Sequence, residues 1–174
     1  GLLHPERVAG MHFFNPVHKM PLVEVVRTDS ASRRAVDVLC GLAARLGKNP
    51  VVVRDGPGFV VNRVLMPYLN EAILLVEEGL PPQRIDQVMQ RFGMPMGPLE
   101  LLDQVGLDVA AHIAKAMAPS FGDRFPRTDA FERMVKNGWL GQKSGKGFYV
   151  HRRRGTRVNH LAVNLLRQGR PAGG

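Results

Sequence analysis

The chain changes character within residues 51–76, which read VVVRDGPGFVVNRVLMPYLNEAILLV. The stretch opens with three consecutive valines, β-branched residues that favour an extended strand. The turn signal Gly56-Pro57-Gly58 follows. Beyond the turn, apolar residues recur at spacings of three and four, which predicts one long amphipathic helix with an inward stripe: Val61, Val64, Leu65, Tyr68, Leu69, Ala72, Ile73 and Val76. The stretch therefore marks the border between an α/β part and a helical part.

Upstream of this border the sequence predicts two further strands and a helix. Residues 11–14 and 22–26 are short apolar runs bounded by turn-forming prolines. A helix is expected to begin at Ser30 or Ser32, to end at Gly47, and to bury one stripe: Val36, Leu39, Cys40, Ala43 and Leu46. Two or three strands and one helix do not complete an α/β sheet, so we expect most of a sheet upstream of this chain.

Downstream of the border every regular pattern is helical. Helices are predicted at 82–92, 98–104, 107–117, 129–137 and 158–168, the first with Ile85, Val88, Met89 and Phe92 turned inward. Residues 138–150 form a glycine-rich loop in this interpretation. The predicted fold class is mainly α, with an α/β end at 1–55, a helical domain at 56–150 and a basic tail or linker at 151–174.

Composition excludes several classes of protein. A single cysteine, Cys40, allows no internal disulfide and no cysteine-based zinc site. No apolar run is long enough to span a membrane, and no signal peptide opens the chain. The chain does not begin with Met, and we expect it to be a fragment of a longer protein.

The net charge of +9 favours acidic partners such as nucleic acid, anionic lipid or phosphorylated ligands. Part of it lies in the tail, which is interpreted either as a solvated linker or as a phosphate-binding patch: Arg152, Arg153, Arg154, Arg157, Arg167 and Arg170. Aromatic residues are only 6% of the chain and none follows Tyr149, which argues against nucleic-acid binding by stacking.

A histidine and a glutamate are the first candidates for chemistry. His12 lies in the first apolar strand, and Glu24 is the only charged residue of the second. If the two strands are neighbours, the carboxylate can hold one ring nitrogen and leave the other as a general base. A structural hydrogen bond between the two side chains is the alternative.

Two further residues are candidates for ligand binding. Asn62 begins the long helix just after the glycine turn, where the backbone can approach a ligand closely, although an ordinary helix-start asparagine is the alternative. Lys143 is a loop cation suited to a phosphate or a ribose, or simply a solvated lysine. The chain contains no G-x-G-x-x-G dinucleotide motif, no P-loop and no spacing of ligands typical of a metal site.

Four sequence motifs, in the same order along the chain, resemble those of the 3-hydroxyacyl-CoA dehydrogenase family. Residues 10–24, GMHFFNPVHKMPLVE, are similar to its catalytic signature, and 55–63, DGPGFVVNR, to the opening of its C-terminal helical domain. Residues 93–98, GMPMGP, and 141–149, GQKSGKGFY, match later phrases. The sequences of residues 18–21 and 157–159 look more like those of the multifunctional β-oxidation proteins, which fuse an enoyl-CoA hydratase domain to the dehydrogenase.

The resemblance implies a fold, a reaction and a set of roles. Residues 1–55 would be the end of a Rossmann-type NAD-binding domain. The family oxidises an L-3-hydroxyacyl-CoA to the 3-ketoacyl-CoA with NAD as cofactor, in fatty-acid β-oxidation. His12 would be the base and Glu24 its orienting partner, Asn62 would bind the acyl-CoA, and Asn15 and Lys143 would touch NAD.

The resemblance also implies partners and a location. The expected partners are the acyl-CoA substrate, the missing N-terminal part of the Rossmann domain, and a second helical domain in a homodimer or in the same chain; no nucleic acid is expected. The location would be cytoplasmic in a bacterium, and mitochondrial or peroxisomal in a eukaryote. The family's glycine-rich NAD fingerprint lies upstream of its catalytic histidine, and only 11 residues precede His12. We therefore expect the chain alone to bind NAD poorly and to be inactive. The alternative is a non-catalytic interaction or dimerisation module.

Overall fold

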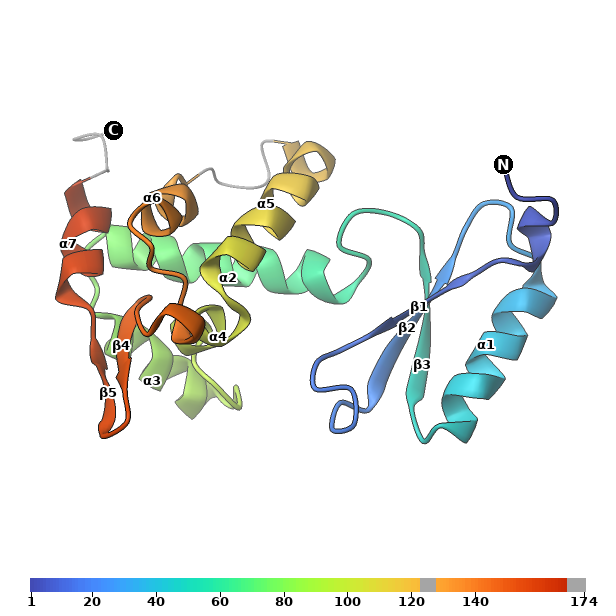
Figure 1. The fold of residues 1–174 in the computed structure, drawn as a ribbon, viewed down its shortest axis with the longest axis horizontal. Helices are drawn as coiled ribbons and strands as arrows, with labels where there is room; N and C mark the ends of the chain where they lie inside the picture. Colours follow the sequence, from blue (N-terminus) through green and yellow to red (C-terminus); the bar gives the residue numbers. More distant parts are fainter. Residues whose placement is uncertain (123–127, 169–174) are drawn as a thin grey trace. The chain divides into compact units, whose positions relative to one another are not determined.

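The computed structural model describes residues 1–122 and 128–168 of the chain, which form two compact units with a border between Arg63 and Val64 (Figure 1). The border between them falls in the first turn of helix α2 (Val61–Glu77). We call them the N-terminal and the C-terminal unit and describe each by itself.

The N-terminal unit is a three-stranded sheet covered on one face by a helix (Figure 1). Strand β1 (Gly10–Phe13) pairs antiparallel with β2 (Leu22–Arg27), and β2 pairs parallel with β3 (Asn49–Arg54). Helix α1 (Arg33–Arg45) connects the two parallel strands. A short 3-10 helix, η1 (Pro5–Arg7), precedes β1. The three predicted strands and the helix are all present.

The packing of α1 follows the predicted stripe in its middle and departs from it at the end. Ser32 caps the helix, because its Oγ accepts a hydrogen bond from the Ala35 N–H at 3.2 Å. Val36 and Ala43 are buried against Val23 and Val25 of β2. Leu46 is 56% exposed, because the helix has already ended at Arg45.

The C-terminal unit is built from helices around one apolar core (Figure 1). After α2 come α3 (Pro82–Phe92), α4 (Pro98–Val105), α5 (Leu107–Phe121) and α6 (Ala130–Lys136). Leu69, Ile73 and Val76 of α2 are buried, as predicted. The inward assignments of Val64, Val88 and Phe92 were wrong: these side chains are 71%, 48% and 80% exposed. Periodicity locates a helix but does not resolve residues at the margin of its apolar face.

The predicted tail is part of this unit. Strands β4 (Tyr149–Arg152) and β5 (Gly155–Val158) form an antiparallel hairpin, and α7 (His160–Gln168) follows. Ala162, Val163 and Leu166 of α7 belong to the core. The interpretation of 151–174 as a linker is therefore wrong for residues 151–168, and the end of the loop predicted at 138–150 is a strand. The predicted last helix is present, whereas Arg170 lies outside the described residues.

Two buried aspartates hold the C-terminal unit together. Asp86 of α3 accepts hydrogen bonds from the Leu99 and Glu100 N–H groups, at 2.9 and 3.2 Å, and so caps α4 from outside. It also accepts a hydrogen bond from the Tyr149 hydroxyl at 2.5 Å. Burial raises the pKa of Asp86 and, together with the Asp86 carboxylate, that of Tyr149. The hydrogen bonds to Asp86 thus stabilise the helical unit together with its apolar core.

Asp103 of α4 likewise accepts backbone hydrogen bonds, in this case from the segment that leads into β4. Its carboxylate accepts hydrogen bonds from the Phe148 and Tyr149 N–H groups, at 2.8 and 2.9 Å, and meets His151 Nε2 at 2.8 Å. Burial raises the pKa of Asp103, and these hydrogen bonds partly oppose the shift. A Cβ at Gly147 would lie 2.0 Å from the Asp103 carboxylate, so the glycine is what lets the two segments meet.

Candidate functional site

The antiparallel register of β1 and β2 places His12 directly opposite Glu24. The two side chains meet: His12 Nδ1 lies 2.8 Å from Glu24 Oε2. Glu24 is 1% exposed, whereas 36% of the His12 side chain is accessible. The contact expected from the sequence is therefore present, and it joins a buried carboxylate to a histidine that solvent can reach.

The start of α2 holds the other oxygen of Glu24. Oε1 accepts hydrogen bonds from the N–H groups of Val60 and Val61, at 3.0 and 2.9 Å. The free N–H groups at a helix start favour a negative charge. The chain reaches this position through the glycine turn and through Phe59, whose φ is +42°. The glycine turn thus positions the two backbone N–H groups that hold the Glu24 carboxylate.

This arrangement fixes the tautomer of His12. A buried carboxylate with two backbone donors on one oxygen accepts a third hydrogen bond on the other, so Nδ1 carries the proton. Nε2 of the neutral ring then has a free lone pair. The ring packs edge-on against Phe14, with centroids 4.9 Å apart, and lies tilted against Phe59, with centroids 5.5 Å apart. His12 is therefore an oriented imidazole whose free nitrogen can accept a proton.

The two predicted asparagines lie in the same unit as this pair. Asn15 is exposed, three residues beyond His12, and its peptide bond to Pro16 is cis. Asn62 is half-buried and follows Val61, one of the two residues that donate to Glu24. The structure thus places one amide after β1 and one in the first turn of α2. Their roles toward cofactor and substrate stay predictions.

Lys143 belongs to the other unit. It lies in the 3-10 turn η3 (Gln142–Ser144), where its ammonium forms an ion pair with Asp108 in the first turn of α5. A hydrogen bond from Lys143 holds the pKa of Asp108 below its usual value. The lysine is thus a tethered cation, and its role toward NAD stays a prediction. The ion pair was missed, because 35 residues separate its partners and neither patterning nor charge spacing connects them.

Lys143→Met should raise the pKa of Asp108 toward its ordinary value, because the lysine hydrogen bond is the largest cause of the shift. A folded pKa below the unfolded one stabilises the protein above the unfolded pKa, and this is lost as pH falls through the folded pKa. The variant should therefore have a lower free energy of unfolding at neutral pH, and the difference should vanish in acid. Because both side chains are accessible, the loss should stay below about 1 kcal/mol. An NMR titration of the Asp108 carboxyl checks this, with Lys146→Met as control. An unchanged titration would contradict the pairing.

Glu24→Gln should lower kcat about 10²-fold, less than the loss of His12 itself. The glutamine oxygen can still accept from Val60 and Val61, but its amide N–H would point at Nδ1 and favour the tautomer protonated on Nε2. Steady-state kinetics of an active enzyme that contains this chain measures the change. If the substitution unfolds the protein, as read by circular dichroism, the pair is structural rather than catalytic.

Comparison with known proteins gives this fold and site a family. A family model of the 3-hydroxyacyl-CoA dehydrogenase NAD binding domain matches residues 1–56, and a model of the C-terminal domain of the same family matches residues 58–151. The fold is thus the end of a Rossmann-type NAD-binding domain followed by a helical domain. The chain belongs to the 3-hydroxyacyl-CoA dehydrogenase family.

Particular relatives agree with this assignment. The fatty acid oxidation complex subunit alpha of Pseudomonas syringae pv. tomato is 51% identical over 152 residues, which are 86% of this chain and 21% of that protein. Among solved structures, M. tuberculosis FadB2 has 44% identity and a TM-score of 0.81, covering 85% of this chain and 53% of its own. The (S)-3-hydroxybutyryl-CoA dehydrogenase PaaH1 from Ralstonia eutropha has 39% identity and a TM-score of 0.82, covering 87% and 54%.

The chain spans about a fifth of the length of such curated relatives and about half of these solved chains. Among the helices of residues 1–122 and 128–168, none is long and apolar enough to cross a membrane.

Proposed function

We propose that this chain is the part of an NAD-dependent L-3-hydroxyacyl-CoA dehydrogenase that carries the general base. The observation that supports this most directly is the His12–Glu24 pair, with Nδ1 held at 2.8 Å by a buried carboxylate. A base of this kind is what oxidation of a secondary alcohol needs, since the hydroxyl proton must leave as C3 loses a hydride. The reaction would serve fatty-acid β-oxidation, as the names of the relatives suggest.

In this proposal His12 Nε2 takes the proton from the C3 hydroxyl of the substrate. Glu24 keeps the ring in the competent tautomer and stabilises the imidazolium that forms. Asn62, one residue beyond the donors to Glu24, binds the acyl-CoA near its reacting end. NAD, when bound, supplies the hydride acceptor.

The residues of this chain fit one part of an NAD site only. In the N-terminal unit, Asn15 offers an exposed amide close in sequence to His12. Lys143, a cation paired with Asp108, belongs to the C-terminal unit, and its contact with NAD remains a separate prediction. The glycine-rich phosphate turn that NAD-binding domains use is absent from the sequence. We therefore expect the isolated 174-residue chain to bind NAD weakly, and the phosphate-binding turn to come from another segment of the NAD-binding domain. The domain border at residue 55 remains a prediction, as do a cytoplasmic location and pairing of helical domains.

A chimera tests the proposal. Residues 1–174 replace the matching part of M. tuberculosis FadB2, and the remaining half of FadB2 is the expected source of the phosphate-binding turn. With L-3-hydroxybutyryl-CoA and NAD, the chimera should form NADH, followed by absorbance, while the 174-residue chain alone should form none. A folded chimera that forms no NADH would contradict the proposed activity and favour the non-catalytic interaction module.

A further inference from the structure

The loop between β1 and β2 is exposed and is held by polar contacts. Asn15 and residues 17–21 are all accessible to solvent. Within the loop, the N–H groups of Lys19 and Met20 donate to the Pro16 carbonyl, at 2.9 and 3.0 Å, and form one turn. A single turn that buries little apolar surface does not offset the entropy lost on ordering its residues. The shape of this loop therefore depends on the contacts that it makes with its surroundings.

Lys48, the residue before β3, supplies such contacts. Its ammonium donates to the carbonyl of Met20 at 2.8 Å and also to the carbonyl of Val17. The backbone beside it adds another link, because the Asn49 N–H donates to the Pro21 carbonyl at 2.7 Å. Hydrogen bonds from a charged donor are stronger than those from a neutral one. Lys48 therefore ties the end of the turn to the start of β3.

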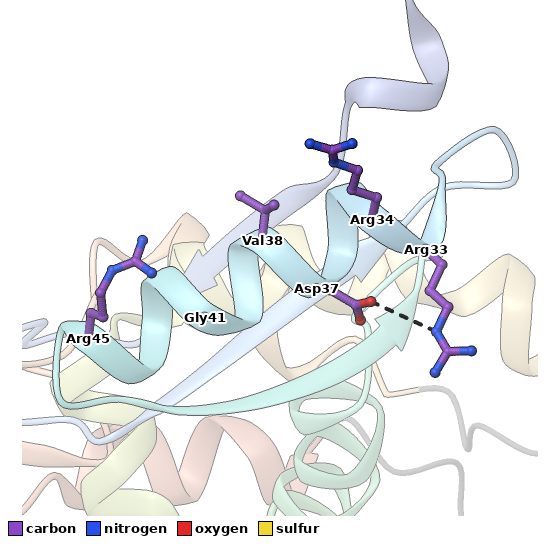
Figure 2. A pocket seen from close by; sticks show the side chains of 6 residues that line it. All are labelled: Arg33, Arg34, Asp37, Val38, Gly41 and Arg45. Carbon is purple, nitrogen blue, oxygen red and sulfur yellow. Dashed lines mark ion pairs between the residues drawn. The ribbon is translucent and has the colours of Figure 1, made fainter.

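The end of helix α1 fixes the position of Lys48. The helix ends at Arg45, and Gly47, with a φ of +70°, turns the chain so that the Lys48 N–H donates to the Ala43 carbonyl at 2.9 Å. Arg45, at the same helix end, lines a shallow depression on the face of α1 that points away from the sheet (Figure 2). The two cations thus lie in different surroundings, and it is Lys48 that contacts the loop between β1 and β2.

We propose that Lys48 is a positioning residue, which sets the place of the Asn15 amide by holding the turn that follows it. Pro16, whose carbonyl accepts both hydrogen bonds of the turn, is the next residue after Asn15. A shift of the turn therefore shifts Asn15 as well. The proposal rests on the proposed function, because it takes Asn15 as a contact to NAD.

The general base is held by other contacts. His12 lies within β1, opposite Glu24 in the strand pairing, and Glu24 accepts hydrogen bonds from the N–H groups of Val60 and Val61. Loss of the Lys48 contacts should therefore weaken NAD binding and leave the chemical step unchanged. A purely structural residue would lower the stability of the unit without this selective effect on NAD.

The kinetic test compares Lys48→Met, Asn15→Ala and the double variant in the chimera with FadB2. Lys48→Met should raise KM for NAD about 10-fold, as expected for the loss of one hydrogen bond, while kcat and KM for L-3-hydroxybutyryl-CoA stay the same. In the Asn15→Ala background, Lys48→Met should have no further effect, because the residue through which it acts is gone. Lys19→Met is the matched control: it removes the same charge from an exposed position of the same loop and should change none of these constants.

A second measurement needs neither NAD nor substrate. In the 174-residue chain, hydrogen exchange of the Met20 amide, followed by NMR, reports on the turn directly, because this N–H donates to Pro16. Lys48→Met should speed its exchange about 10-fold, while the amides of β2 keep their rates. Lys19→Met should leave the protection of the Met20 amide unchanged.

Four results would overturn the proposal. Unchanged exchange of the Met20 amide in Lys48→Met would mean that the turn does not need the lysine, and faster exchange throughout β2 would mean that the lysine supports the whole unit. Faster exchange of Met20 with an unchanged KM for NAD would leave Lys48 a structural role only. A rise in KM that persists in the Asn15→Ala background would show that Lys48 does not act through Asn15. Failure of the proposed function is told apart from these results, because the unsubstituted chimera would then form no NADH.

Discussion

His12→Ala is expected to lower kcat of the chimera about 10³- to 10⁴-fold while leaving the fold intact, because it removes the general base and nothing else. The ring is partly accessible, and its contacts are one hydrogen bond to Glu24, an edge contact to Phe14 and a tilted contact to Phe59. The substrate KM should change little if the base acts mainly in the transition state.

The matched control is His18→Ala, which removes an exposed histidine six residues away. Steady-state kinetics and circular dichroism on both variants are the measurement. The assignment of His12 as base is wrong if its alanine variant keeps the parent kcat, or if His18→Ala lowers kcat as much.

Gly141→Ala is expected to destabilise the C-terminal unit by about 3 kcal/mol or more, a large effect for one methyl group. The added Cβ would lie 2.2 Å from the backbone oxygen of Asp103, an atom that cannot swing aside, and φ at this residue is +91°. Strain and clash therefore act together. Asp103 would also be displaced from Phe148 and Tyr149, which it holds through its carboxylate.

Gly138→Ala is the control that separates these two causes. Its φ is +70°, but nothing lies within 4 Å of the added Cβ, so only backbone strain remains. We expect a loss of about 1 to 2 kcal/mol there. Urea unfolding followed by the fluorescence of Trp139, the single tryptophan, measures both variants. Equal losses would mean that the contact with Asp103 is unimportant.

The meeting of His12 and Glu24 could be predicted because it needs only local rules. Two apolar strands joined by a short turn-rich segment pair as neighbours, and a lone acid in a buried strand must find a partner. The change from strand β3 to helix α2 across the glycine turn could be predicted equally well, because the apolar period changes there from that of a strand to that of a helix. In both cases the decisive residues are close together in the sequence.

The buried aspartates could not be found in this way. Asp86 and Asp103 lie on amphipathic helices, where an acid is normally taken as solvated, and their partners are 13 to 63 residues away. The hairpin of β4 and β5 was missed because each strand has four residues and the arginines at 152–154 suggest a solvated segment. These contacts depend on tertiary packing, which no local pattern records.

The most direct test of the account is the tautomer of His12, read from the ¹⁵N shifts of its ring in the 174-residue chain at a pH where the ring is neutral. The account predicts a proton on Nδ1 and a bare Nε2, and a shift toward the opposite tautomer in Glu24→Gln. A proton found on Nε2 in the unsubstituted chain would contradict it, because that nitrogen could then not serve as the base.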